Sequence, residues 1–214
     1  TEAIDISVME PSDVRLLNQY HKDVYEKLSP YLTMEELQAV MEKDIQNARL
    51  RRVRDIFVFS CFTGLAYSDT YYLTEEHLYK ANDGKMWIKK PRQKTKVIAD
   101  IPLLEVPLQI LDKYRGQQTG GRLLPVCSNQ KVNQYLKELA TVCGINKELT
   151  YHVARYTFAT SLTLLHDVPM ASIAKMLGHT NIRQTQHYAK ATNILLSRSM
   201  QNLSEQLNLR MEIK

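Results

Sequence analysis

Residues 86–103 read MWIKKPRQKTKVIADIPL and contain the clearest β-strand signal in the chain. Met86–Ile88 and Val97–Ile101 are rich in the bulky and β-branched side chains that favour strands. Asn82-Asp83-Gly84, just upstream, is typical of a tight turn. Residues 91–96 form a basic connection between the two strands. We therefore expect one small antiparallel sheet in this part of the chain.

Helical patterns lie on both sides of the predicted sheet. Thr33 precedes Glu35-Glu36 and an apolar face, which predicts a capped amphipathic helix. The apolar run from Val53 to Phe62 predicts a buried helix that ends near Gly64. The fold class is therefore α+β, a mainly helical domain with a small antiparallel sheet. Further helices are expected near 11–20, at 107–114 and 129–143, from Thr150, from Pro169 to Gly178, before Tyr188 and at 194–207.

Composition limits the classes of protein without selecting one. The 214 residues carry 28 Lys and Arg against 23 Asp and Glu, a net charge of +5 that permits a polyanionic partner without requiring one. Three cysteines without a CxxC motif argue against a disulfide framework or a zinc ribbon, and they fit a reducing cytoplasm. No apolar run approaches the roughly 20 residues that span a bilayer. We expect a cytoplasmic protein with no membrane partner.

Two short motifs carry side chains that suit phosphate chemistry. His152 and Arg155 are three residues apart on a predicted helix, so both side chains can face one target. Arginine offers a planar fork of donors to phosphate, and histidine transfers protons near neutral pH. His179 follows Gly178, where a helix is expected to end, and Tyr188 lies nine residues further on. Taken singly, each motif is more typical of structural or solvated residues than of a catalytic site.

Together, these motifs resemble the tyrosine recombinase (phage integrase) family. His152-Val-Ala-Arg155, Leu177-Gly178-His179 and Tyr188 follow the family's order and spacing. Thr63-Gly64-Leu65 resembles the family's Thr-Gly-Leu-Arg box, and Lys94 with Ile101-Pro102-Leu103 resembles its hairpin lysine and the following strand. The resemblance covers roughly residues 33–200.

The resemblance implies a site-specific recombinase or integrase of a mobile genetic element, acting on double-stranded DNA in a tetrameric synapse. Tyr188 would attack the phosphate and form a 3′-phosphotyrosine, and Lys94 would protonate the leaving 5′-oxygen. His152 would assist proton transfer from the tyrosine. Arg155 and His179 would bind the non-bridging oxygens, and Asp69 would brace the site. No ATP, metal ion or other cofactor is implied.

One position departs from the family pattern. The box normally has a catalytic arginine where this chain has Ala66, and losing one such donor costs about 2.7–4 kcal/mol of transition-state stabilisation. Arg92 is the candidate replacement, because in an extended segment it would point to the same side as Lys94. A plain DNA-backbone or solvent contact is an equally good interpretation of Arg92. Arg122 and Arg54 are the next candidates.

Two other functions remain open at this point. Ala66 also fits a DNA-binding module that has lost catalysis, and a type IB topoisomerase would use the same chemistry. We expect a linker or leading helix over 1–32, the catalytic domain over 33–192 and a C-terminal helix or tail over 193–214. The apolar stripe of that tail fits packing on its own domain or on a neighbouring subunit. Because the chain opens with Thr1, we expect it to be a fragment or a processed product.

Overall fold

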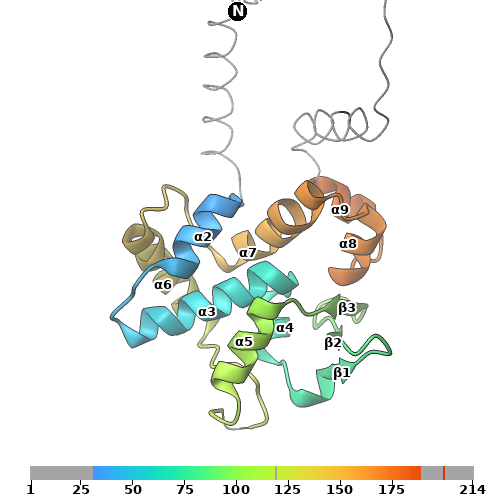
Figure 1. The fold of residues 1–214 in the computed structure, drawn as a ribbon, viewed down its shortest axis with the longest axis horizontal. Helices are drawn as coiled ribbons and strands as arrows, with labels where there is room; N and C mark the ends of the chain where they lie inside the picture. Colours follow the sequence, from blue (N-terminus) through green and yellow to red (C-terminus); the bar gives the residue numbers. More distant parts are fainter. Residues whose placement is uncertain (1–30, 119, 189–199, 201–214) are drawn as a thin grey trace, which may run out of the picture.

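The computed structural model describes residues 31–118, 120–188 and 200. Helices form most of this part, and a small sheet lies at one side (Figure 1). The core centres on α3, Ala48–Thr63, which packs against α5, α6 and α7. Phe57 and Phe59 are fully buried within it. The α+β prediction is confirmed.

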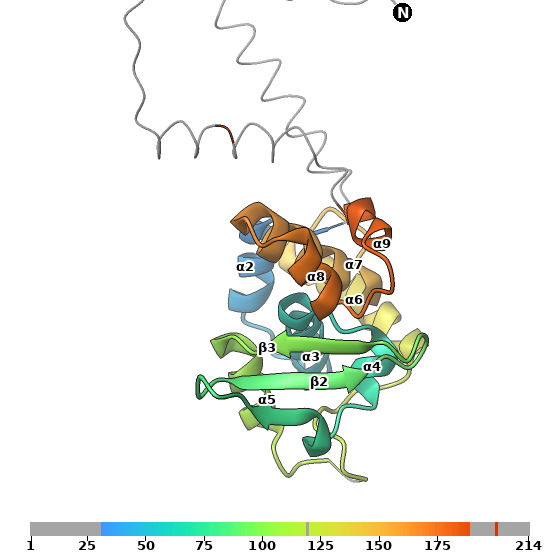
Figure 2. The same ribbon diagram turned by 90° about the vertical axis from the view of Figure 1, so that its right-hand side faces the viewer.

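The sheet has three antiparallel strands in the order β1-β2-β3. They are β1, Leu78–Lys80; β2, Met86–Pro91; and β3, Ile98–Pro102. The predicted turn at residues 82–84 joins β1 to β2, where the Gly84 N–H donates to the Ala81 carbonyl. Figure 2 shows β3 on the side of the sheet nearest α8, against which it packs. The sheet therefore presents its β2–β3 turn to the C-terminal helices.

The helices before the sheet follow their predicted caps. In α2, Met34–Glu42, Thr33 and Glu36 form a full capping box. α3 ends at Gly64, whose φ of 67° is the left-handed conformation that glycine adopts without strain. The short α4, Tyr67–Tyr71, follows directly after Ala66, and η2, Glu75–His77, leads into β1. Gly64 thus turns the chain from the core helix toward the hairpin.

The helices after the sheet also match the sequence prediction. They are α5, Glu105–Tyr114; α6, Asn129–Cys143; α7, Tyr151–Thr157; α8, Met170–Met176; and α9, Arg183–Gln186. A π-helix, η3 (Phe158–Thr163), and a short η4 (Leu164–His166) continue from α7. The pattern gave no sign of this π-helical stretch. The helices expected near 11–20 and at 194–207 lie outside the described residues, apart from residue 200.

A second, smaller apolar cluster forms between η3 and α8. Its buried members include Phe158, Leu164, Ile173 and Leu177, and Tyr188 belongs to it. This cluster brings Tyr188 back against the helical segment that continues from α7, the helix that carries Arg155.

Candidate active site

Arg155 is the centre of the site. It is buried, with 4% of its surface exposed. Its Nη1 donates to the Gly64 carbonyl at 2.5 Å, and its Nη2 donates to the Leu177 carbonyl at 2.7 Å. Burial, and then Arg92, lowers the pKa of Arg155 to about 10, while the neighbouring Tyr188 and Asp69 act in the opposite direction. The guanidinium therefore stays charged at neutral pH and joins three separate segments.

His179 is held between Arg155 and Thr185. Its Nε2 accepts from Arg155 Nη2 at 3.0 Å, and its Nδ1 lies 2.8 Å from the Thr185 hydroxyl. Because arginine only donates, Nδ1 carries the proton of the neutral ring. Burial, followed by Arg155 and Arg92, lowers the pKa of His179 to about 4. His179 is therefore neutral near pH 7, and its Nε2 is engaged by Arg155 in this arrangement.

Tyr188 lies against these two residues. Its ring is stacked on His179, with centroids 6.1 Å apart and planes 1° apart. Tyr156 meets the same ring edge-on at 4.8 Å. Only 8% of Tyr188 is exposed. The structure thus brings the three residues 155, 179 and 188 together within one chain.

Arg92 reaches the same place from the hairpin. Its Nη1 donates to the Leu177 carbonyl at 3.3 Å, so that one oxygen accepts from both Arg92 and Arg155. Its Nε pairs with Asp69 at 3.3 Å, and Asp69 also accepts from the Gln93 N–H at 2.8 Å. Asp69 is 1% exposed and so holds the start of the turn rigidly. Two guanidinium groups therefore converge beside the position of Ala66.

Gly178 makes this approach of Arg92 possible. Its φ is 59°, and a Cβ at this position would stand 2.7 Å from Arg92 Cδ. The Leu-Gly-His motif thus has a packing role in addition to its expected role as a helix stop. Any larger residue at 178 would push Arg92 away from the Leu177 carbonyl.

Lys94 and His152 lie at the edges of the cluster. The expectation that residues 92–94 are extended is wrong: a turn forms here, with the Lys96 N–H donating to the Arg92 carbonyl and the Arg92 N–H donating to the Val97 carbonyl. Lys94 is exposed on this turn and contacts none of the cluster. His152 is also exposed to solvent over much of its surface. The partial burial of its ring, followed by Arg155 and Arg92, lowers its pKa.

The two other candidate arginines, Arg54 and Arg122, have partners outside the cluster. Arg54 donates to the Lys43 carbonyl and pairs with Asp55. Arg122 stacks over the Tyr71 ring at 4.7 Å. Neither makes a hydrogen bond with a member of the cluster. Arg92 is the candidate that the geometry favours.

Sequence reasoning missed Tyr156 and Thr185. Tyr156 lies between His152, at 4.9 Å between ring centroids, and Tyr188. Its position four residues after His152 on a predicted helix was the available signal. Thr185 is fully buried, and its hydroxyl contacts the protonated Nδ1 of His179. No sequence motif indicated this residue.

The described residues contain neither a metal-binding cluster nor a membrane-spanning helix. They contain no group of three His, Cys, Asp or Glu side chains arranged to hold a metal ion. They also contain no helix that is long and apolar enough to cross a membrane. The cluster therefore has to be interpreted from its arginine, histidine and tyrosine side chains.

The comparison with protein families gives one long match. The model described as "Phage integrase family" matches residues 30–193. A shorter match, to the C-terminal region of peptidase_M24, covers residues 1–46 and includes none of the cluster. The long match includes every residue of the site described above.

Individual relatives and solved structures agree with the long match. Tyrosine recombinase XerC of Rickettsia canadensis is 28% identical over 156 residues, covering 66% of this chain and 48% of the relative. A tyrosine recombinase of Agathobacter rectalis is 38% identical over 76 residues, 33% of this chain and 24% of the relative. The chain thus spans about half or less of these relatives.

The solved structures share the fold. XerA recombinase has a TM-score of 0.63 at 20% identity, covering 85% of this chain and 66% of that chain. A lambda integrase dimer bound to a core site has a TM-score of 0.60 at 16% identity, covering 76% and 60%. XerH recombinase, seen before and after cleavage of its difH substrate, has a TM-score of 0.63 in both complexes.

Proposed function

Because this chain belongs to the phage integrase family, we propose that it is the catalytic part of a DNA recombinase that uses Tyr188 as its nucleophile. The observation that carries the proposal is the stacking of Tyr188 on His179, which itself accepts from Arg155. A phenol, with its usual pKa of about 10, needs nearby cationic donors in order to attack a phosphate. Here the cationic donors are Arg155 and Arg92, which come from two segments of one chain.

The proposed reaction gives each of these groups a role. The Tyr188 oxygen attacks the phosphorus of double-stranded DNA and forms a 3′-phosphotyrosine, and the 5′-oxygen leaves. Lys94, exposed on the β2–β3 turn, is the proposed acid for that oxygen. Neutral His152 is the proposed acceptor for the tyrosine proton, because its lowered pKa leaves it unprotonated near pH 7. The bond energy is kept in the phosphotyrosine, so rejoining requires no nucleotide.

Arg92 is the proposed replacement for the arginine absent at Ala66. Its guanidinium shares the Leu177 carbonyl with Arg155, so a phosphate at Arg155 would also meet Arg92. Such donors stabilise the charge that develops on the non-bridging oxygens. His179 would complete this set of phosphate ligands in the other neutral tautomer, in which Nδ1 accepts from the Thr185 hydroxyl and Nε2–H, released from Arg155, donates to the phosphate.

A nicked suicide substrate tests the nucleophile. The substrate carries the ends of the element that encodes the chain, and loss of the short strand traps the covalent complex. We expect a protein–DNA adduct that Tyr188→Phe abolishes, with Tyr72→Phe, at an exposed tyrosine, as the matched control that keeps it. An adduct that persists in Tyr188→Phe would overturn the assignment.

The alternative motivated by Ala66 is a DNA-binding module without catalysis. Arg92→Ala and Arg92→Lys discriminate, since both should abolish the adduct while DNA binding stays nearly unchanged. The parent chain binding DNA without ever forming an adduct would favour the alternative. If Arg92→Ala cleaves normally, Arg122→Ala and Arg54→Ala are the next variants to measure.

The finer parts of the proposal concern the intact protein. We propose that the recombinase serves a mobile genetic element and acts in a tetrameric synapse in the cytoplasm. The catalytic domain is proposed to span residues 33–192, within the family match. Crosslinking on DNA, with and without truncation after residue 193, tests whether the tail docks on a neighbouring subunit.

A further inference from the structure

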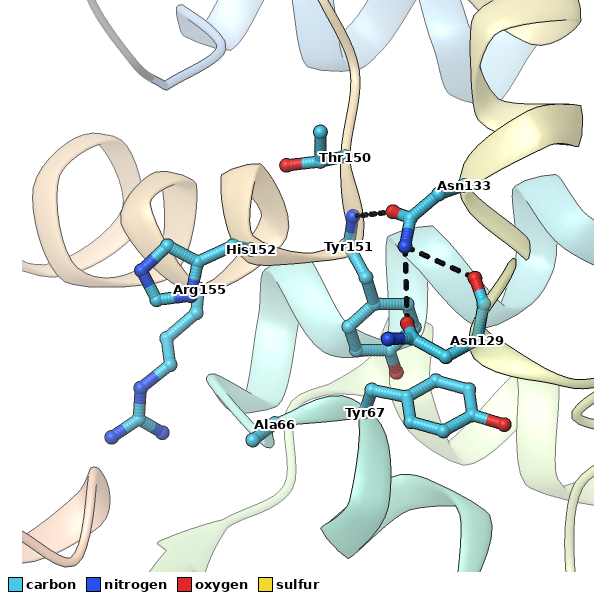
Figure 3. Close-up of a pocket in the computed structure, with 8 residues that line it drawn as sticks. All are labelled: Ala66, Tyr67, Asn129, Asn133, Thr150, Tyr151, His152 and Arg155. Carbon is cyan, nitrogen blue, oxygen red and sulfur yellow. Dashed lines mark hydrogen bonds between the residues drawn. The ribbon is translucent and has the colours of Figure 1, made fainter. Parts of the chain in front are cut away.

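A cavity of about 240 Å³ lies beside the candidate active site. Figure 3 shows His152 and Arg155 on one side of it and Asn129 and Asn133 on the other. The mechanism proposed above uses nothing from the second side. Ala66, Tyr67, Asn129, Asn133, Thr150, Tyr151, His152 and Arg155 line the cavity.

The cavity also presents donors that the proposed mechanism does not use, the first of them on the exposed Asn129. Asn133 accepts from the Tyr151 N–H at 2.8 Å and donates to the Asn129 carbonyl and to Asn129 Oδ1, at 3.0 and 3.1 Å. These bonds fix the Asn129 amide with its oxygen already engaged. Its Nδ2 makes no hydrogen bond with any residue that the structure describes, and Figure 3 shows it beside the opening between the two walls.

Thr150 supplies a second such donor. It stands at the N-cap position of α7, where a threonine hydroxyl usually accepts from a backbone N–H. Here the hydroxyl makes no such capping bond. Figure 3 shows the Thr150 oxygen on the same side as the His152 ring. A threonine that does not cap its helix is available to a ligand.

The charges around the cavity indicate the charge of the ligand that it would bind. No carboxylate lines it, and its charged neighbour is the Arg155 guanidinium. Threonine hydroxyls and asparagine amides are usual partners of DNA phosphate oxygens. An anion with several acceptor oxygens fits this set of donors.

We propose that the cavity binds the phosphodiester next to the scissile phosphate on the cleaved strand. Asn129 Nδ2 and the Thr150 hydroxyl are its donors, and Asn133 positions Asn129. The inference rests on the proposed function, because it takes the scissile phosphate to lie at Arg155. The subsite fixes the register of the strand, so that the correct phosphorus faces Tyr188.

Neutral donors give this subsite a distinctive signature. The salt dependence of DNA affinity reflects the counterions that cationic side chains displace. Removing an uncharged donor should therefore weaken binding without changing the slope of affinity against salt. Removing a lysine or arginine contact changes both.

The first test measures duplex affinity over a range of salt, in a Tyr188→Phe background so that cleavage plays no part. We expect Thr150→Val with Asn129→Ala to weaken binding about tenfold, as for a hydrogen bond to a charged group, at an unchanged slope. Thr150→Ser should restore part of the loss. Thr141→Val, at the exposed far end of α6, combined with Asn146→Ala in the exposed loop after it, is the matched control. Unchanged affinity in the cavity variant, or an altered slope, overturns the proposal.

The second test locates the phosphate. Neutral methylphosphonates replace single phosphates on either side of the mapped cleavage position. One flanking replacement should weaken binding by the parent chain and have no further effect on the cavity variant. If the cavity variant alters only the effect of a methylphosphonate at the scissile position, the proposal is overturned. The proposed function has a separate outcome that would reject it. It fails if the parent chain forms no adduct, even where the cavity variant binds DNA more weakly than the parent chain does.

Discussion

Gly178 and Arg92 show how single residues set the geometry of the site. The positive φ of Gly178 permits the turn into His179, and its missing side chain leaves room for the Arg92 stem. Gly144 has a similar φ of 69° but open space around it. The two glycines therefore separate the cost of the backbone conformation from the cost of displacing Arg92.

Gly178→Ala should abolish the covalent adduct and lower the free energy of unfolding by more than Gly144→Ala does. The left-handed conformation alone costs about 1–2 kcal/mol for a residue with a Cβ, and both variants incur it. The clash with Arg92 is added only at 178. Urea denaturation and the suicide-substrate assay measure the two effects. Equal losses in both variants would contradict the proposed contact.

His179 makes the stability of the fold depend on pH. Its pKa is about 4 in the fold and about 6.5 in the unfolded chain, so between these values the unfolded chain binds more protons. The free energy of unfolding should therefore fall as the pH drops from 6.5 toward 4. Denaturation at pH 7.5 and pH 5 should show a smaller loss in His179→Gln than in the parent chain. An identical loss would show that other groups account for the effect.

At the scale of elements, the hairpin is anchored by a buried lysine. Lys90 is 2% exposed, and its Nζ lies 2.8 Å from the Tyr72 carbonyl and 2.9 Å from His77 Nε2. His77 Nδ1 lies 2.7 Å from the Thr74 hydroxyl and 3.1 Å from the Thr74 N. With the ring proton on Nδ1 and directed at that hydroxyl, Nε2 accepts a hydrogen bond from the Lys90 ammonium. Burial, followed by Lys90, lowers the pKa of His77 and so favours this neutral ring.

His77→Ala should lower the free energy of unfolding by about 1–3 kcal/mol, because it leaves buried partners unpaired. The turn that carries Arg92 follows directly, so the rate of adduct formation should fall as well. Glu76→Ala, at an exposed neighbour, is the control. An equal loss of stability in Glu76→Ala would show that the contact between His77 and Lys90 is not the cause.

The elements were largely predictable because each has a local signal. The capping box at Thr33, the glycine stops at 64 and 144 and the turn at 82–84 all lie within a few residues of the boundaries they set. The turn at 92–97 was not predictable in the same way. Its conformation depends on Asp69, which is more than 20 residues away in sequence and accepts from Gln93 N–H.

At the scale of the whole molecule, the start of the described chain is tied to the helix of the site. The Leu32 N–H donates to the Thr157 hydroxyl at 3.0 Å, and the Ser161 hydroxyl donates to the Leu32 carbonyl. Leu32 is fully buried. These bonds cross 125 and 129 residues of sequence and fix the entry of the chain two residues from Arg155.

Thr157→Val should cost about 1–3 kcal/mol of unfolding free energy, because it leaves the buried Leu32 N–H without a partner. Thr160→Val is the matched control on the same helical segment. The Thr160 hydroxyl is buried without a hydrogen bond among the described residues, so its removal should be neutral or stabilising. Chemical denaturation of the two variants decides between these expectations. A comparable loss in both would mean that packing volume dominates.

The candidate site was predictable as a set of residues and only partly as an arrangement. The resemblance in motif order and spacing singled out His152, Arg155, His179 and Tyr188, the side chains to which the proposed chemistry assigns roles. It gave no account of the Leu177 carbonyl, which accepts from both arginines. Such a contact involves a backbone atom, and no residue type encodes it.

Placing Arg92 on the sheet turn has a consequence for control. In the family pattern the arginine missing at Ala66 would extend from the rigid core, independently of the lysine loop. Here the proposed phosphate ligand Arg92 and the proposed leaving-group acid Lys94 are two residues apart on one loop. A single displacement of that loop would remove both groups from the site together, so the proposed site would be either complete or inactive, with no partly active state.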